Sequence, residues 1–296
     1  MTRSAARDIS YATSVRSRPA RVLVRTVENA TGRLKLIKRA EGYERDVAEG
    51  QDFWEVMATR YGLSLDVTQG TLAHIPTTGP LIIVSNHPFG ILDGLMMGLI
   101  LSRRRRDFRI LAHRIFNKPE DINRVILPIS FDGTKEAAAL NIETRKTALD
   151  YLAEGGAIGV FPGGTVSTAN KPFGLPLDPG WRTFTAKMIA RSGANVVPIY
   201  FEGQNSRLFQ LCSHAHATLR TALLVKEFGK RVDRPVEVRI GAPLRQDAIQ
   251  SFRSDPRGMM DFLRQQTYSL SGKPAETLGY GFEYEERHKK NGSRHI

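Results

Sequence analysis

The sequence predicts an α/β fold: a mostly parallel central sheet flanked by helices, with a basic helical segment at the N-terminus. Short apolar runs such as 81–84 and 195–201 alternate with helix-length stretches such as 91–101 and 134–154. This alternation is typical of parallel sheets whose crossover helices cover both faces. The 296 residues are 41% hydrophobic and 25% charged, so the chain has enough apolar material for one large core.

The N-terminal segment, residues 1–62, is rich in basic residues. Its first forty residues contain ten Lys or Arg and two acidic residues. Residues 1–18 show no periodicity and are expected to lack order. From 19 to 39, basic residues flank apolar ones, a pattern that fits helical association with anionic lipid, and Gly32 interrupts it. The same pattern fits two alternatives, a solvated helix docked on the core and an arm that binds nucleic acid.

The remaining elements follow from hydrophobic periodicity and from the turn residues between them. Residues 44–61 carry apolar residues on one face and predict a helix. The expected strands are 64–67, 71–74, 80–85, 108–112, 125–129, 157–161, 195–201 and 236–240, and the other expected helices are 91–101, 134–154, 181–191 and 256–270. These elements define one α/β domain, 63–275. A polar C-terminal tail spans 276–296, and its part 283–296 is expected to fray.

The formal net charge of +13 implies an acidic partner: nucleic acid, an anionic membrane surface or an acidic carrier protein. The single cysteine, Cys212, cannot form an intrachain disulfide or a thiolate cluster, and no metal site is expected. The longest nearly apolar stretch, 91–101, contains Asp93 and is shorter than the roughly 20 residues that span a bilayer. We therefore expect a cytoplasmic protein that lies peripherally on the inner face of the cell membrane.

The strand 81–84 leads into the run Ser-Asn-His-Pro, residues 85–88, just before the helix 91–101. It thus brings His87 to the carboxyl edge of the sheet, where open α/β sheets bind ligands, and Asp93 follows six residues later. The sequence contains no Gly-x-Ser-x-Gly elbow, P-loop, His-Glu-x-x-His, Cys-x-x-Cys or Gly-x-Gly-x-x-Gly. A His–Asp pair without a nucleophile suits direct acyl transfer. The histidine takes the proton of an acceptor hydroxyl, and the carboxylate fixes the histidine tautomer.

A second loop follows the strand 157–161 and contains Gly163, Gly164 and Thr165. Two glycines and a hydroxyl residue can present backbone N–H groups to a developing oxyanion or to a phosphate. A tight turn without a ligand is the alternative, but the histidine loop on a nearby strand favours a functional role. We therefore expect these three residues and Asn86 to bind substrate.

Three segments carry a family resemblance: 86–93 (Asn-His-Pro-Phe-Gly-Ile-Leu-Asp), 161–165 (Phe-Pro-Gly-Gly-Thr) and 196–199 (Val-Val-Pro-Ile). In order and separation they resemble three motifs of the glycerolipid (lysophospholipid) acyltransferases of the His-x4-Asp type, over residues 65–245. The resemblance implies His87 as general base, Asp93 as its partner, an acyl thioester donor and a lyso-lipid acceptor, with no cofactor. Acyl carrier protein or coenzyme A would carry the thioester, and the basic charge of the chain suits either.

The sequence departs from the family pattern in three places. Five residues rather than four separate His87 from Asp93, and Gly90 is suited to absorb the extra one. Gly163 stands where the family has glutamate, and Val166 stands where an arginine often follows the threonine. The family's Gly-x-x-Phe-x-x-Arg motif has no clean counterpart.

The missing arginines bear on the acceptor, because in the family they are expected to hold the phosphate of a glycerol phosphate. Arg124 and Lys135 are the expected substitutes. The motifs look more like the bacterial branch that acylates lyso-ornithine lipid and related lyso-aminolipids, through the 3-hydroxyl of an amide-linked fatty acyl chain. Glu202, directly after the strand 195–201, would pair with a head-group amine, and a surface salt bridge is the alternative.

Other functions use parts of the same pattern. A 1-acyl-glycerol-3-phosphate (lysophosphatidic acid) acyltransferase would share the site and differ in the acceptor. A thioesterase would use His87 to activate water. A non-catalytic basic protein that binds membrane or nucleic acid would have no use for a His–Asp strand end. Nucleic acid is disfavoured as a partner, because the arginine run 103–106 and the basic residues 1–40 contain almost no aromatic residues.

Overall fold

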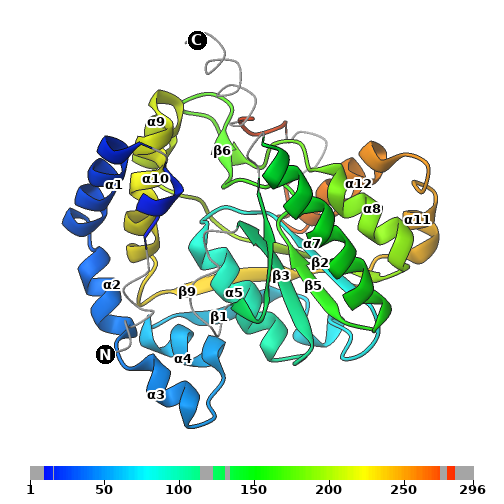
Figure 1. Ribbon diagram of the computed structural model, residues 1–296. Coiled ribbons are helices and arrows are strands. Elements are labelled where there is room, and N and C mark those ends of the chain that lie inside the picture. Colours follow the sequence, from blue (N-terminus) through cyan, green and yellow to red (C-terminus); the bar gives the residue numbers. More distant parts are fainter. Residues whose placement is uncertain (1–9, 16, 114–122, 131–133, 274–278, 284–296) are drawn as a thin grey trace.

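The computed structural model describes residues 10–15, 17–113, 123–130, 134–273 and 279–283. Its centre is a seven-stranded sheet in the order β1-β9-β8-β2-β5-β3-β4 (Figure 1). The strands are β1 Ser64–Gln69, β2 Leu81–Ser85, β3 Phe108–His113, β4 Ile126–Ile129, β5 Ala157–Val160, β8 Asn195–Phe201 and β9 Pro235–Ile240. Neighbouring strands are parallel except β8 and β9, so the expected mostly parallel α/β fold is confirmed. A separate antiparallel ribbon joins β6 (Thr168–Ala169) and β7 (Pro176–Leu177).

Helices cover both faces of the sheet. They are the 3-10 helices η2 Ala12–Ser14 and η3 Leu72–His74, and α1 Arg18–Ala30, α2 Arg33–Ala40, α3 Tyr43–Ala48, α4 Phe53–Arg60, α5 Ile91–Ser102, α7 Lys135–Ala153, α8 Thr183–Ser192, α9 Arg207–Ala215, α10 Ala217–Gly229, α11 Gln246–Gln250 and α12 Pro256–Ser269. Strand β2 lies between β5 and β8, and all of its residues are buried. Leu81 and Ile83 share a core with α4 and α5, whereas Ile82 and Val84 share one with α7, α8 and α12.

Some expected elements are wrong. The single helix expected over 44–61 is two helices, α3 and α4, because the chain turns at Gly50, whose φ of +93° favours glycine. Asp52 then caps α4 by accepting two backbone N–H groups. The strand expected over 71–74 is the 3-10 helix η3. Helices α9 and α10 have no counterpart among the expected elements.

The basic N-terminal pattern forms α1 and α2, which separate at Gly32, where φ is +117°. Helix α1 packs against α10, and Leu36 and Ala40 of α2 belong to the main core beside the sheet. The described part of the N-terminal segment therefore shares a core with the α/β domain.

The lack of order expected over 1–18 is wrong where the structure describes this stretch, at residues 10–15 and 17–18; residues 1–9 and 16 lie outside the described part. Glu28 of α1 is fully buried, and its carboxylate accepts hydrogen bonds from the Ser10 hydroxyl and the Tyr11 backbone N–H. A buried carboxylate needs such donors. They tie the segment before α1 to the fold.

Of the tail 276–296, the structure describes residues 279–283, and the part expected to fray lies outside the described residues except for Glu283. Phe282 is buried, and its backbone N–H donates to the Thr168 carbonyl at 2.9 Å. Among the described helices, none combines the length and the apolar character needed to cross a membrane.

Close packing between α4 and α5 depends on Gly98. A Cβ at this position would overlap the Trp54 ring, whereas a Cβ at Gly94, one turn earlier in α5, would meet nothing within 4 Å. We predict that Gly98→Ala lowers the free energy of unfolding by about 1–3 kcal/mol, the usual cost of overpacking a core. Gly94→Ala is the matched control, and its better helix propensity stabilises by up to about 1 kcal/mol. Urea unfolding measures both, and equal stability of the two variants would contradict the packing argument.

Candidate active site

Asn86 anchors the end of β2 to the neighbouring strand. Its side-chain Nδ2 donates to the Phe201 carbonyl at 2.9 Å, and its Oδ1 accepts the Phe201 N–H at 2.8 Å. The backbone pairing of β2 with β8 ends at Ser85, so the buried amide continues the ladder by one more residue. This clamp fixes the place where the chain leaves the sheet. Asn86 therefore supports the loop that carries His87.

His87 follows this clamp and faces Asp93. Its Nδ1 lies 2.9 Å from Asp93 Oδ2, and Asp93 is fully buried while 18% of the His87 side chain is exposed. Nδ1 itself is buried, and its orientation does not form an aligned hydrogen bond, so the contact is an electrostatic pairing. A carboxylate beside Nδ1 favours the proton on that nitrogen and leaves Nε2 with a lone pair. The Phe161 ring stacks on the imidazole with centroids 4.4 Å apart and limits its rotation.

The five-residue spacing between the two groups is absorbed at Gly90. Gly90 has φ +90° and precedes α5, and its N–H and that of Phe89 both donate to Asp93 Oδ2 at 2.9 and 2.8 Å. Asp93 thus closes a tight turn at the N-terminus of α5, where the helix dipole favours a negative charge. The expected bulge at glycine takes the form of this left-handed turn.

The Gly-Gly-Thr loop differs from its expected role in one respect. The Gly164 N–H donates to the Phe161 carbonyl at 3.0 Å and closes a turn, so this amide is not available to a substrate oxyanion. Thr165 is half-buried, and no acceptor for its backbone N–H lies within the part of the chain that the structure describes. Further along, the Ser167 N–H donates to the His87 carbonyl at 2.8 Å and joins the two loops.

A second buried carboxylate, Asp178, holds the His87 loop from the other side. Its Oδ1 accepts the His87 backbone N–H at 3.2 Å and the Ser167 hydroxyl, and its Oδ2 accepts the Trp181 Nε1–H at 2.9 Å. Its own N–H donates to the Tyr268 hydroxyl at 2.8 Å. Burial raises the pKa of the Asp178 carboxyl, and the donated hydrogen bonds oppose that rise.

A protein family described as Acyltransferase matches residues 51–275. The chain belongs to this acyltransferase family. It is similar to the lyso-glycine lipid O-acyltransferase of Phocaeicola vulgatus, with 27% identity over 229 residues that cover 75% of this chain and 78% of the relative. It is also similar to the crystal structure of the 1-acyl-sn-glycerophosphate (LPA) acyltransferase PlsC from Thermotoga maritima. There the TM-score is 0.45 and the identity 15%, over 88% of this chain and 86% of that one.

The match confirms the family resemblance of the sequence motifs, and the protein is an enzyme that transfers acyl groups. Two of the expected binding residues, Arg124 and Glu202, lie outside the His87 loops. Arg124 precedes β4, and since β4 is parallel to its neighbours, Arg124 lies at the opposite edge of the sheet, about 13 Å of strand away. The structure therefore does not bring Arg124 and His87 together, and substrate binding by Arg124 stays a prediction. Glu202 follows β8 at the correct edge and forms an ion pair with Arg239 at 3.3 Å.

Two residues that support the site were not expected from the sequence. Asp178 lies before a Pro-Gly turn, where an acidic residue is ordinary and its burial has no local signal. Arg220 of α10 is also buried, and it donates to the Thr165 hydroxyl at 3.0 Å and the Val166 carbonyl at 2.7 Å. Within the described residues, no cluster of three His, Cys, Asp or Glu could hold a metal ion.

We predict that Asp178→Asn lowers the kcat of the acyltransferase about ten- to hundredfold and changes KM little. Asparagine keeps one acceptor oxygen but turns an NH2 group toward the Trp181 Nε1–H, which displaces the loop that carries His87. Steady-state kinetics on purified protein measures the effect, with thermal unfolding as the check that the fold persists. Ser167→Ala removes one donor and leaves the carboxylate, so it should lose less activity. A wild-type kcat for Asp178→Asn would contradict the positioning role.

Proposed function

We propose that this acyltransferase moves a fatty acyl group from an acyl thioester to the hydroxyl of a lyso-lipid, with His87 as general base. The observation that carries the proposal is the pairing of His87 Nδ1 with the buried Asp93 carboxylate at a strand end. The hydroxyl nearest to His87 in sequence, that of Ser85, is buried and donates to the Asn86 carbonyl at 3.0 Å, and the Ser167 hydroxyl donates to Asp178, so neither pairs with His87 as a nucleophile would. A histidine base without a serine or cysteine beside it fits direct transfer.

In the proposed reaction the acceptor hydroxyl gives its proton to His87 Nε2 while its oxygen attacks the thioester carbonyl carbon. The Asp93 carboxylate stabilises the imidazolium that forms. The carbonyl oxygen becomes an oxyanion, and the Thr165 backbone N–H is the donor we assign to it. Collapse of this intermediate breaks the C–S bond. The leaving thiolate takes the proton from the imidazolium, which leaves the O-acyl lipid and a free thiol.

The acceptor that we propose is a lyso-aminolipid, such as lyso-ornithine lipid or lyso-glycine lipid. The relative named as a lyso-glycine lipid O-acyltransferase supports this class. Acyl carrier protein and coenzyme A thioesters both suit a chain of net charge +13 as donors.

We predict that His87→Ala abolishes transfer, with at least a thousandfold lower kcat, because the hydroxyl then lacks its base. Purified protein is incubated with acyl-carrier and coenzyme A thioesters and a panel of lyso-ornithine lipid, lyso-glycine lipid and lysophosphatidic acid. Mass spectrometry identifies the products.

His216→Asn serves as the control, since asparagine preserves the helix cap that His216 provides for α10. Free fatty acid without acylated lipid would identify a thioesterase, and no thioester turnover by the wild-type enzyme would overturn the proposal.

We also propose that α1, α2 and α9 face an anionic membrane. Exposed apolar residues lie on these helices and on α10: Val22, Leu23, Leu34, Leu208, Leu211 and Leu219. Exposed basic residues accompany them on α1 and α2: Arg18, Arg21, Lys35, Lys38 and Arg39. Helix α1 packs on α10, and Figure 1 shows α1, α9 and α10 together on one side of the molecule. Apolar side chains among cations suit insertion between anionic head groups.

We predict that the double substitution Val22→Asp and Leu23→Asp lowers binding to phosphatidylglycerol vesicles at least tenfold. The two side chains are 66% and 45% exposed, so the change leaves the core intact but removes apolar area and adds negative charge. Vesicle flotation measures the bound fraction. Ile142→Asp, at a 65% exposed site on α7, is the matched control and should bind as the wild type does. Equal binding by the double variant would refute this surface.

A further inference from the structure

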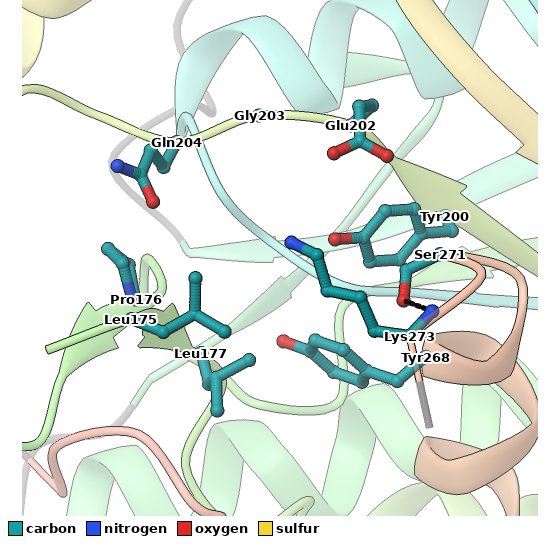
Figure 2. A pocket seen from close by; sticks show the side chains of 10 residues that line it. All are labelled: Leu175, Pro176, Leu177, Tyr200, Glu202, Gly203, Gln204, Tyr268, Ser271 and Lys273. Atoms are coloured by element: carbon teal, nitrogen blue, oxygen red, sulfur yellow. Dashed lines mark hydrogen bonds between the residues drawn. The ribbon is translucent and has the colours of Figure 1, made fainter. Parts of the chain in front are cut away.

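A cavity of about 190 Å³ lies at the same edge of the sheet as His87 (Figure 2). Tyr268 forms part of its wall, and the Tyr268 hydroxyl accepts the Asp178 N–H at 2.8 Å. Asp178 in turn accepts the His87 N–H. Two hydrogen bonds through one buried residue therefore connect the wall of the cavity with the histidine loop. The cavity thus lies near the active site, but neither His87 nor Asp93 lines it.

The polar atoms of the cavity come from the end of β8 and from the segment after α12. Figure 2 shows the Lys273 ammonium and the Tyr200 hydroxyl turned into the cavity, below Glu202 and Gln204. Burial and the charge of Glu202 raise the pKa of Tyr200 to about 12, so its hydroxyl is a hydrogen-bond donor at neutral pH. Leu175 and Leu177 provide an apolar wall.

The charges in this cavity favour an anion. The Glu202 carboxylate is matched by Arg239 at 3.3 Å. Among the described residues, no carboxylate forms an ion pair with Lys273, so the ammonium adds one net positive charge. A cation and a phenol hydroxyl in a half-enclosed space bind a carboxylate well. The carboxylate edge of Glu202 remains available for an amino group of the same ligand.

The lining of the cavity suits a polar head group. Side chains of Tyr200, Glu202 and Lys273 place polar atoms in it, and Leu175 and Leu177 form an apolar wall. The polar atoms suit the free carboxylate of an amide-linked amino acid, and the apolar wall suits its methylenes.

We propose that this cavity is the head-group subsite of the acyltransferase, where Lys273 and Tyr200 hold the carboxylate of an amino-acid head group and Glu202 receives an amino group when the head group has one. The inference deepens the proposed function and rests on its acceptor class. In a lyso-aminolipid the reacting hydroxyl is only a few bonds from the head-group amide. A head group held beside Asp178 would thus keep that hydroxyl near His87.

The kinetic test compares lyso-ornithine lipid with its carboxamide analogue, which lacks the negative charge. Lys273→Met should raise KM for the carboxylate acceptor at least tenfold and leave kcat within about twofold. For the carboxamide, wild type and variant should have the same KM, already high. Lys187→Met, an exposed lysine on α8 outside the cavity, is the control and should match the wild type. An unchanged KM, or an equal rise with the carboxamide, would overturn the subsite.

A binding test separates this inference from the proposed function. Calorimetric titration with soluble N-hexanoylornithine should show binding to wild type and loss of it in Lys273→Met, whether or not turnover occurs. Binding without any lipid acylation would keep the subsite and refute the proposed function. Acylation without binding, or with a KM insensitive to Lys273, would keep the proposed function and refute the subsite. A Lys273-dependent preference for lysophosphatidic acid over the carboxylate lipid would assign the cation to a phosphate and overturn the carboxylate subsite.

Discussion

Two buried carboxylates flank His87, and the structure around the site depends on the hydrogen bonds that they accept. An ionised carboxylate buried without donors costs several kcal/mol. Asp93 accepts its hydrogen bonds locally, at Oδ2, from the Phe89 and Gly90 N–H groups just before α5. Asp178 depends on groups from separate segments, among them the His87 backbone and the Trp181 indole. The histidine loop is therefore fixed only when the strand ends of β2 and β5 and the segment before α8 come together.

Helix α10 links the proposed membrane surface to this centre. The buried Arg220 of this helix donates to the Thr165 hydroxyl and the Val166 carbonyl at the end of the Gly-Gly-Thr loop. The helix also packs against α1. Tyr11, before α1, also reaches the site: a Cβ on Gly90 would lie 3.9 Å from its hydroxyl. Burial raises the pKa of that hydroxyl, and nearby carboxylates act in the same direction. Helices that would touch lipid and loops that would hold the acyl group are thus one packed unit.

Local sequence patterns were enough to place β2, α5 and the pairing of His87 with Asp93, because six residues and one strand end define that geometry. Interactions between distant segments had no such signal. Asp178 is 91 residues from His87 in sequence, and its burial follows only from the folded loops. The position of Arg124 had no local signal either: order along the chain suggested a motif position, whereas strand direction carries this residue to the edge of the sheet opposite His87. Helices α9 and α10 were also not predicted from the sequence, and therefore neither was the role of Arg220, which lies on α10.

Gly163 and Asp178 are in close contact, and the absence of a side chain at 163 leaves room for the Asp178 carboxylate. A Cβ on Gly163 would lie 3.2 Å from Asp178 Cγ and Oδ2, so any side chain there would push into the second carboxylate. The family resemblance leads one to expect glutamate at that position. Two carboxylates in this enclosed space would repel each other and share too few donors. In this chain Asp178 occupies the space beside Gly163, and its segment also contains Leu175 and Leu177, which line the cavity.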